Sequence, residues 1–406
     1  MRKKTLGDIP SGAWAGLRVL VRADFNVPLD REGRITDASR IRSTVPTLER
    51  LLDAGARVIL LSHLGRPKGP DDASMSLRPV AAELSDLLSG RRVTFVEATV
   101  GEEARAAVER LDPGQAVLLE NTRFLPGETK NDPDVARGLA ALGDHFVNDA
   151  FGTAHRAHAS NVGVAEAVRE KGGEAVAGLL LERELRFLED ALAEPKRPFV
   201  AIFGGAKISG KIDVIEAVLP RVDRLLIGGA MANTFFRALG LDTGRSLVEE
   251  DRVEMAGDLL ERAGDRILLP VDCVVAAEIE DDAKTQNVDR TEVSGDDRIG
   301  DVGPRTREIF AAELRRAGTV VWNGPMGVFE RAPFAGGTMA VAKSVADAGD
   351  AGALTIVGGG DSAAAVEAAG VAARISHVST GGGASLELLS GASLPGVEVL
   401  TDREDG

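Results

Sequence analysis

The sequence predicts an α/β protein built from two doubly wound, Rossmann-like parallel-sheet domains that are joined by a helical hinge. The first observation is the length of 406 residues, because a single hydrophobic core stops growing at roughly 250–300 residues. The second is a regular alternation of short apolar runs with helix-like segments. The third is that these runs are continuously apolar, which is typical of strands buried on both faces in a parallel sheet covered by helices.

The predicted strands fall into two series, one in each half of the chain. Each run is rich in valine, isoleucine and leucine, and most runs end in glycine, asparagine or aspartate. The first series spans 17–24, 56–63, 92–98, 115–121 and 145–149, and the second spans 198–205, 223–229, 266–272, 319–324, 353–359 and 376–382. Five and six strands in succession predict one parallel sheet for each half.

Helical patterns lie between the predicted strands. Residues 37–56 begin with an Asp/Ser cap and end at Gly55, which predicts a helix. Residues 175–195 carry apolar residues at helical spacing and stop before Pro195, between the two series, so we interpret them as the connecting helix, with the domain boundary near 185–197. The predicted domains are therefore 1–184 and 185–390, followed by a tail at 391–406. The acidic stretch 278–297 is interpreted as an exposed loop.

The composition excludes several classes of protein. A formal net charge of −15 argues against a broad surface for nucleic acid or anionic membrane. No apolar run approaches the ~20 residues of a membrane span, and the basic N-terminus is not followed by the apolar segment of a signal peptide. The single cysteine, Cys273, allows no internal disulfide and fits a reducing cytoplasm. Lysine is scarce relative to arginine, which fits either a salt-adapted source or a GC-rich genome.

Basic residues follow several predicted strands of the first half. Because ligands of parallel sheets bind at the carboxyl ends of the strands, these residues are candidates for one site, which comprises Arg22, Asp24, Asn26, Arg40, His63, Arg66, Arg123 and Arg156. One arginine alone is most often a solvated surface charge. Five from separate loops instead predict a small ligand with several negative charges, because guanidinium binds phosphate and carboxylate bidentately. Asp24 and Asn26 could bind hydroxyl groups of that ligand.

The stretch 204–212, GGAKISGKI, matches the spacing of a phosphate loop from Gly205, but Ile212 stands where Ser or Thr should hold Mg²⁺. If a helix starts after Gly205, Lys207 and Lys211 share one face of its first turns. Lysine is unfavourable there unless an anion binds at the helix N-terminus. Glycine-rich segments also follow later strands, and Asp361 in one of them could hold Mg²⁺ on nucleotide phosphates. We therefore interpret the match as chance spacing over a different kind of nucleotide site.

Ten segments, in order along residues 17–390, resemble the phosphoglycerate kinase family. They are RADFNVP, DASRI, SHLGRP, ENTRF, DAFGTAHRAH, GGAKISGK, IGGAMANTF, WNGPMGVFE, IVGGGDSAAA and STGGGASLE. The resemblance implies reversible phosphoryl transfer from 1,3-bisphosphoglycerate to ADP, giving 3-phosphoglycerate and ATP with Mg²⁺, in glycolysis and gluconeogenesis. It also implies a cytoplasmic monomer, small-molecule substrates and no nucleic-acid or membrane partner.

The resemblance further implies the site residues. Domain 1–184 would bind 3-phosphoglycerate through the eight candidates above, and the tail would pack on that domain. Arg40, Lys207 and Gly382 would be catalytic. Domain 185–390 would bind the nucleotide, with Asp361 as the Mg²⁺ ligand. The implied nucleotide-binding residues are Ala206, Lys207, Lys211, Gly229, Asn323, Pro325, Gly327, Val328, Glu330, Gly359, Gly360, Asp361 and Ser362. The chain departs from the family pattern at Thr122, Ala159 and Ser362, and none of these removes a charge.

Two other classes of protein remain to be distinguished by experiment. A dinucleotide-dependent dehydrogenase would carry G-x-G-x-x-G after the first strand with an acid ~20 residues on, and no such motif follows the first predicted strand. A non-catalytic phosphate-binding protein would not require Arg40, Lys207 and Asp361 together. The kinase interpretation predicts that the two domains close on their ligands, because the basic cluster and the nucleotide site lie on different domains.

Overall fold

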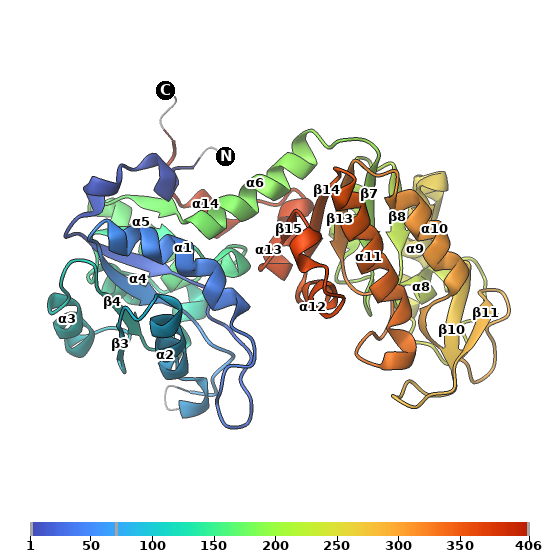
Figure 1. The fold of residues 1–406 in the computed structure, drawn as a ribbon, viewed down its shortest axis with the longest axis horizontal. Helices are drawn as coiled ribbons and strands as arrows, with labels where there is room; N and C mark the ends of the chain where they lie inside the picture. The colour runs from blue at the N-terminus through green and yellow to red at the C-terminus, as the bar shows by residue number, and fades with distance from the viewer. Residues whose placement is uncertain (1–2, 70–71, 404–406) are drawn as a thin grey trace. The chain divides into compact units, whose positions relative to one another are not determined.

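The computed structural model describes residues 3–69 and 72–403 and divides them into two compact units (Figure 1). Unit 1 contains the described residues up to Arg186 together with those from Ser393 onward, and unit 2 contains Phe187–Ala392. The chain passes from unit 1 to unit 2 within helix α6 (Leu179–Ala193). Within the described ranges, no helix combines the length and apolar character needed to cross a membrane.

Unit 1 is organised around a parallel sheet, for which six strands are described in the order β3-β4-β2-β1-β5-β6. The strands are β1 (Arg18–Arg22), β2 (Arg57–Leu61), β3 (Val93–Val96), β4 (Ala116–Leu119), β5 (His145–Asn148) and β6 (Ala175–Ala177). The first five confirm the predicted runs, and all neighbouring pairs are parallel.

The predicted start of the connecting helix was wrong. Residues 175–177 form strand β6, which pairs with β5 from Phe146↔Ala175 to Asn148↔Ala177, and helix α6 begins at Leu179. A three-residue strand is too short to show a period of its own, and pairing with the edge of the sheet outweighs local helix propensity. Asp149, which follows β5, accepts hydrogen bonds from the N–H groups of Leu180 and Leu181 at 2.9 and 3.2 Å. This buried carboxylate, whose pKa burial raises to about 6, therefore caps the first turn of α6.

Unit 1 also contains the helices α1 (Ser39–Asp53), α2 (Arg78–Leu87), α3 (Glu102–Glu109), α4 (Pro133–Ala140), α5 (Val164–Glu170) and α14 (Pro395–Glu398). Of these, α1, α2, α3 and α5 contact its sheet. Helix α1 lies within the predicted 37–56, and its buried face joins residues of β2 in one apolar cluster. Asp37 accepts a hydrogen bond from Ser39 N at 2.8 Å. In the segment from Ser393 onward, Gly396 N donates to Ala154 O at 2.8 Å and Thr401 N donates to Ala175 O at 2.8 Å.

Unit 2 contains a second parallel sheet, described with six strands in the order β15-β14-β13-β7-β8-β9. Its strands are β7 (Phe199–Phe203), β8 (Arg224–Ile227), β9 (Ile267–Leu268), β13 (Thr319–Asn323), β14 (Leu354–Gly358) and β15 (His377–Val378). Each of the six predicted runs contributes one strand. Phe310, Trp322 and Val341 are at most 1% exposed in the cluster that covers this sheet.

A small antiparallel sheet in unit 2 was not predicted. Its described strands are β10 (Asp272–Ala276), β11 (Gln286–Asp289) and β12 (Arg298–Val302), in the order β11-β10-β12. The interpretation of 278–297 as a loop throughout was therefore wrong for β11. That strand reads Gln-Asn-Val-Asp and is partly exposed, so its sequence has no apolar run that could reveal it, and pairing with β10 alone defines it.

The helices of unit 2 are α7 (Ile212–Val218), α8 (Met231–Ala238), α9 (Val253–Ala263), α10 (Pro304–Leu314), α11 (Gly336–Asp350), α12 (Gly360–Ala368) and α13 (Gly382–Leu389). The supposition that a helix starts after Gly205 was wrong, because α7 begins only at Ile212. Gly205 has a φ of +98°, and residues 206–211 form turns and bends. Lys207 and Lys211 therefore lie on a loop and do not share a helix face.

Candidate active site

In unit 1, His63, Arg66, Arg123 and Arg156 follow strands β2, β4 and β5, and Arg40 lies in the first turn of α1. Arg22 ends β1 and has no exposed surface. Its Nε donates to Ser160 Oγ at 3.0 Å, and its Nη2 lies 3.1 Å from His63 Nδ1. A third hydrogen bond joins Nη1 to Ala23 O. These three contacts fix the orientation of the buried Arg22 guanidinium.

Polar contacts tie the loop after β1 to its neighbours. Arg40 Nη1 donates to Asp24 Oδ2 at 2.6 Å, and the side chain of Asp24 is 8% exposed. Asn26 Oδ1 accepts a hydrogen bond from Gly65 N at 2.7 Å, which joins this loop to the loop after β2. These contacts hold Asp24, Asn26 and Arg40 together in advance of any ligand.

The electrostatics show that the predicted residues converge. The pKa of His63 lies well below its usual value because the ring is buried, and because Arg22, Arg123 and Arg40 oppose a further positive charge. The pKa of Arg123 is lowered by burial and then by its guanidinium neighbours, which are Arg22, Arg156 and Arg66. Unlike Arg22, both Arg66 and Arg156 are exposed. Such a concentration of positive charge is unfavourable by itself and is suited to a multivalent anion.

In unit 2, the predicted nucleotide residues line two adjoining pockets of about 380 and 240 Å³. Both pockets are bounded by Gly205, Ala206, Pro325 and Asp361. The larger one is also lined by Gly229, Gly327, Val328 and Glu330, and the smaller one by Lys207, Lys211, Asn323, Gly359, Gly360 and Ser362. Every residue predicted for the nucleotide therefore borders this pair of pockets.

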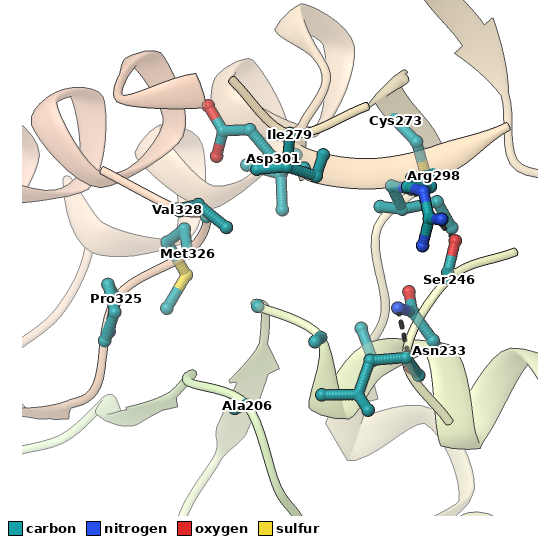
Figure 2. Close-up of a pocket in the computed structure, with 18 of the residues that line it drawn as sticks. Ala206, Asn233, Ser246, Cys273, Ile279, Arg298, Asp301, Pro325, Met326 and Val328 are labelled. Carbon is teal, nitrogen blue, oxygen red and sulfur yellow. Dashed lines mark hydrogen bonds between the residues drawn. The ribbon is translucent and has the colours of Figure 1, made fainter. Parts of the chain in front are cut away.

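The larger pocket has apolar walls with a few polar groups. Figure 2 shows Pro325, Met326 and Val328 along one side, and Asn233, Ser246 and Arg298 at the opposite end. The volume is in the range of small-molecule sites, and an apolar slot suits a flat heterocyclic ring.

The smaller pocket is positively charged and rich in glycine. Lys211 Nζ donates to the carbonyl oxygens of Gly204 and Asn323 at 2.6 and 3.0 Å. Burial lowers the pKa of Lys211 to about 8, and the charge of Asp361 opposes this shift. A Cβ added to Gly324, whose φ is +95°, would lie 2.4 Å from Gly204 O and 2.3 Å from Lys211 Nζ, so the backbone requires glycine at this strand end. Gly382 starts α13, and a Cβ there would lie 3.2 Å from Gly359 Cα, so Gly382 lies beside the glycines of this pocket.

Glu249 is a residue of the site that the sequence did not reveal, because it lies far along the chain from the loop that it holds. Its Oε2 accepts hydrogen bonds from Ile208 N and Ser209 N at 2.5 and 3.1 Å, and Oε1 accepts one from Ser209 Oγ. The pKa of Glu249 is lowered even though burial acts to raise it, because these donors and the charge of Lys207 favour the ionised form. Glu249 therefore anchors the loop that carries Lys207.

We expect Glu249→Gln to weaken catalysis about 3- to 10-fold, because glutamine keeps the size but loses the charge and one acceptor. Steady-state kinetics should show this loss in kcat or in KM for the ligand of the unit 2 pockets, with KM for the ligand of the unit 1 arginine cluster unchanged. The neighbouring exposed Glu250 is the matched control. If Glu250→Gln gave the same loss, the anchoring role of Glu249 would be wrong.

Two parallel-sheet units, one with an arginine cluster and the other with a lysine- and glycine-lined pocket of nucleotide size, define the class of α/β kinases that act on small anions. The family model for phosphoglycerate kinase matches residues 9–392. The chain is 57% identical over 408 residues to phosphoglycerate kinase of Chloroflexus aurantiacus, covering 100% of both chains. It is 53% identical over 416 residues to that of a Synechococcus species, covering 99% of this chain and 100% of the relative.

Solved structures show the same similarity. Phosphoglycerate kinase from Coxiella burnetii matches with a TM-score of 0.85 and 40% identity over 98% of each chain. The enzyme from Pyrococcus horikoshii matches with a TM-score of 0.85 and 33% identity, again over 98% of each chain. The chain belongs to the phosphoglycerate kinase family. It is accordingly an enzyme of glycolysis, a kinase that uses a nucleotide and small-molecule substrates.

Proposed function

We propose that the chain catalyses reversible transfer of a phosphoryl group from 1,3-bisphosphoglycerate to ADP, giving 3-phosphoglycerate and ATP, with Mg²⁺. The observation that carries this proposal is that a cluster of arginines and a pair of pockets with two lysines lie on different units. The arginine cluster of unit 1 suits the multiply charged glycerate, and the paired pockets of unit 2 suit a nucleotide. An acyl phosphate is already a good phosphoryl donor, so positioning and charge neutralisation are the main requirements of the enzyme.

The individual roles that we propose are those that the family resemblance implies, and the chemistry of the side chains fits them. Asp24 and Asn26 bind the hydroxyl part of the glycerate, Arg40 contacts its carboxyl end, and the exposed guanidinium groups of Arg66 and Arg156 bind its phosphate together with Arg123. Arg40 and Lys207 neutralise the charge that the phosphoryl group carries in the transition state. The N–H groups at the start of α13, at Gly382, add donors for the same group. The larger pocket takes the adenosine, with Glu330 on the ribose, and the smaller pocket takes the phosphates.

The residues present fit a magnesium ion that arrives with the nucleotide. Mg²⁺ usually keeps several waters and binds through one or two carboxylates and the substrate phosphates. Asp361 is exposed in the first turn of α12 and borders both pockets. Among residues 3–69 and 72–403, no three His, Cys, Asp or Glu side chains are grouped as an all-protein metal site. We propose Asp361 as the protein ligand, and the ion would neutralise phosphate charge.

We also propose that ligand binding closes the two domains about the end of α6, at 185–197. The reacting atoms must come within about 3–3.5 Å of each other, while the two ligands are proposed to bind different units. Small-angle scattering should show a smaller radius of gyration with 3-phosphoglycerate and a magnesium nucleotide together than with no ligand. An unchanged radius with both ligands bound would contradict closure.

The proposed reaction is tested by a coupled assay of the purified chain with 1,3-bisphosphoglycerate and ADP, reading ATP formation. Turnover supports the proposal. Binding of both ligands without turnover would favour the non-catalytic alternative, and nicotinamide binding would favour a dehydrogenase. We further propose a cytoplasmic monomer, as the family resemblance implies, and sedimentation at working concentration tests the oligomeric state.

A further inference from the structure

We propose that Glu128, acting through Ser160 and Arg22, holds His63 in the neutral form that carries its proton on Nε2. This makes Glu128 a positioning residue of the arginine cluster. The part of the inference that concerns substrate binding rests on the proposed function, in which that cluster binds 3-phosphoglycerate. The part that concerns the state of His63 stands on the geometry alone.

The series of hydrogen bonds begins at a buried carboxylate, that of Glu128. Glu128 is 1% exposed and follows Gly127, whose φ is +96°. Both of its oxygens bind one residue: Oε2 accepts from Ser160 N at 2.9 Å, and Oε1 accepts from Ser160 Oγ at 2.5 Å. A carboxylate with so little exposure needs a compensating positive charge, and the charge of Glu128 acts on both Arg22 and Arg123.

Ser160, the second residue of this series of hydrogen bonds, determines which group donates and which accepts. Ser160 Oγ has one hydrogen, which it donates to Glu128, so towards Arg22 the hydroxyl oxygen can only accept. Arg22 Nε donates to it at 3.0 Å. Glu128 therefore fixes the hydroxyl, and the hydroxyl fixes the plane of the Arg22 guanidinium. In this orientation, Nη2 of Arg22 faces His63.

The last member is the histidine. Arg22 Nη2 lies 3.1 Å from His63 Nδ1, and both side chains are buried. A guanidinium nitrogen is only a donor, so Nδ1 must accept, and the proton of the neutral ring must be on Nε2. Arg22, Arg123, Arg40 and His158 all oppose a second proton, while Asp24 Oδ1, 4.0 Å from Nδ1, favours one. His63 therefore offers an N–H donor to an anion and is not a cation or a base.

The direct test is the ¹⁵N NMR spectrum of the ring nitrogens in the full chain labelled at histidine, with His63→Gln to assign the signals. We expect a single neutral form protonated at Nε2 across pH 6–8. In Glu128→Gln and in Ser160→Ala, we expect a mixture of the two neutral forms, because the hydrogen bonds no longer hold the Arg22 guanidinium in one orientation towards His63. A wild-type His63 protonated at Nδ1, or doubly protonated at pH 6, would overturn the inference.

Kinetics separate a positioning role from general stabilisation. We expect Glu128→Gln to raise KM for 3-phosphoglycerate about 3- to 10-fold, the value of one hydrogen bond, with KM for the nucleotide unchanged. Glu120 is the matched control. It is also a buried glutamate that binds a serine hydroxyl, that of Ser76 at 2.7 Å, and it accepts from the backbone N–H groups of Leu77 and Asn121 at 2.9 and 2.7 Å.

Equal effects of Glu120→Gln and Glu128→Gln would show a merely structural role and overturn the positioning claim. If the wild-type chain showed the expected ring form but no turnover of 3-phosphoglycerate, the proposed function would fail instead, and the assignment of His63 would remain. The two failures are therefore distinguishable.

Discussion

Replacement of Lys207 by alanine is expected to lower kcat about 100- to 1,000-fold. Removing one preorganised charge or donor from a developing transition-state charge typically has an effect of this size. Lys207 is exposed at the smaller pocket, on a loop anchored by Glu249. Lys211, by contrast, already donates to two carbonyl oxygens. Lys207 is therefore the lysine that is free to follow the transferring phosphoryl group.

The measurement is the steady-state rate at saturating 1,3-bisphosphoglycerate and ADP, with the KM for each substrate. KM should change less than kcat, because Lys207 is expected to bind the transition state more strongly than the substrates. The control is Lys284→Ala, since Lys284 is exposed and lies outside the residues that line either pocket. A kcat for Lys207→Ala within a few-fold of wild type would rule out the catalytic role.

The second large effect is expected for Arg40→Ala, which should also lower kcat about 100-fold or more. Arg40 is proposed to neutralise the transferring group from the side of unit 1, and it also pairs with Asp24 at 2.6 Å. The alanine variant removes the first charge and leaves the carboxylate of Asp24, 8% exposed, without this partner. The loss should therefore extend to the binding of 3-phosphoglycerate.

Two further variants, Arg42→Ala and Arg66→Ala, are needed to interpret the kinetics of Arg40→Ala. Arg42 lies two residues further along α1, is exposed and is outside the proposed site, so Arg42→Ala should leave the kinetics unchanged. Arg66→Ala should mainly raise KM for 3-phosphoglycerate, because Arg66 is proposed to hold its phosphate. If Arg40→Ala raised KM only, as Arg66→Ala is expected to do, Arg40 would be a binding residue and not a catalytic one.

The strands that the sequence revealed share one property. Runs such as 198–205 and 353–359 are continuously apolar because helices cover both faces of a parallel sheet. Burial can therefore be recognised from consecutive apolar residues in the local sequence. Two strands that the sequence did not reveal, β6 and β11, lack an apolar run of this kind, whereas β10 reads Asp-Cys-Val-Val-Ala, is buried, and was missed because it begins at the last residue of the predicted run 266–272. Strand β6 is three residues long, and β11 is polar and partly exposed. Hydrogen bonds to neighbouring strands alone define them.

The same distinction applies to the candidate site. Arginines and glycines at strand ends indicated the site, because the chemistry of phosphate binding demands those residue types at that edge of a sheet. Glu249 and Glu128 were not indicated, because a glutamate in a turn looks like any solvated charge until its partners are known. Lys211 was predicted on a helix, and its actual position on a loop depends on the carbonyl oxygens of Gly204 and Asn323.

The sequence by itself determined the two parallel sheets, the kinase family and the kinds of side chain that we propose for ligand binding, since apolar burial and anion binding both constrain residue type locally. Only the tertiary structure decided where α6 and α7 begin, and which carboxylates hold the basic residues in place. The physical reason is that hydrogen bonds and ion pairs form between residues distant in the chain. Their strength depends on distance and burial, which a linear sequence does not contain.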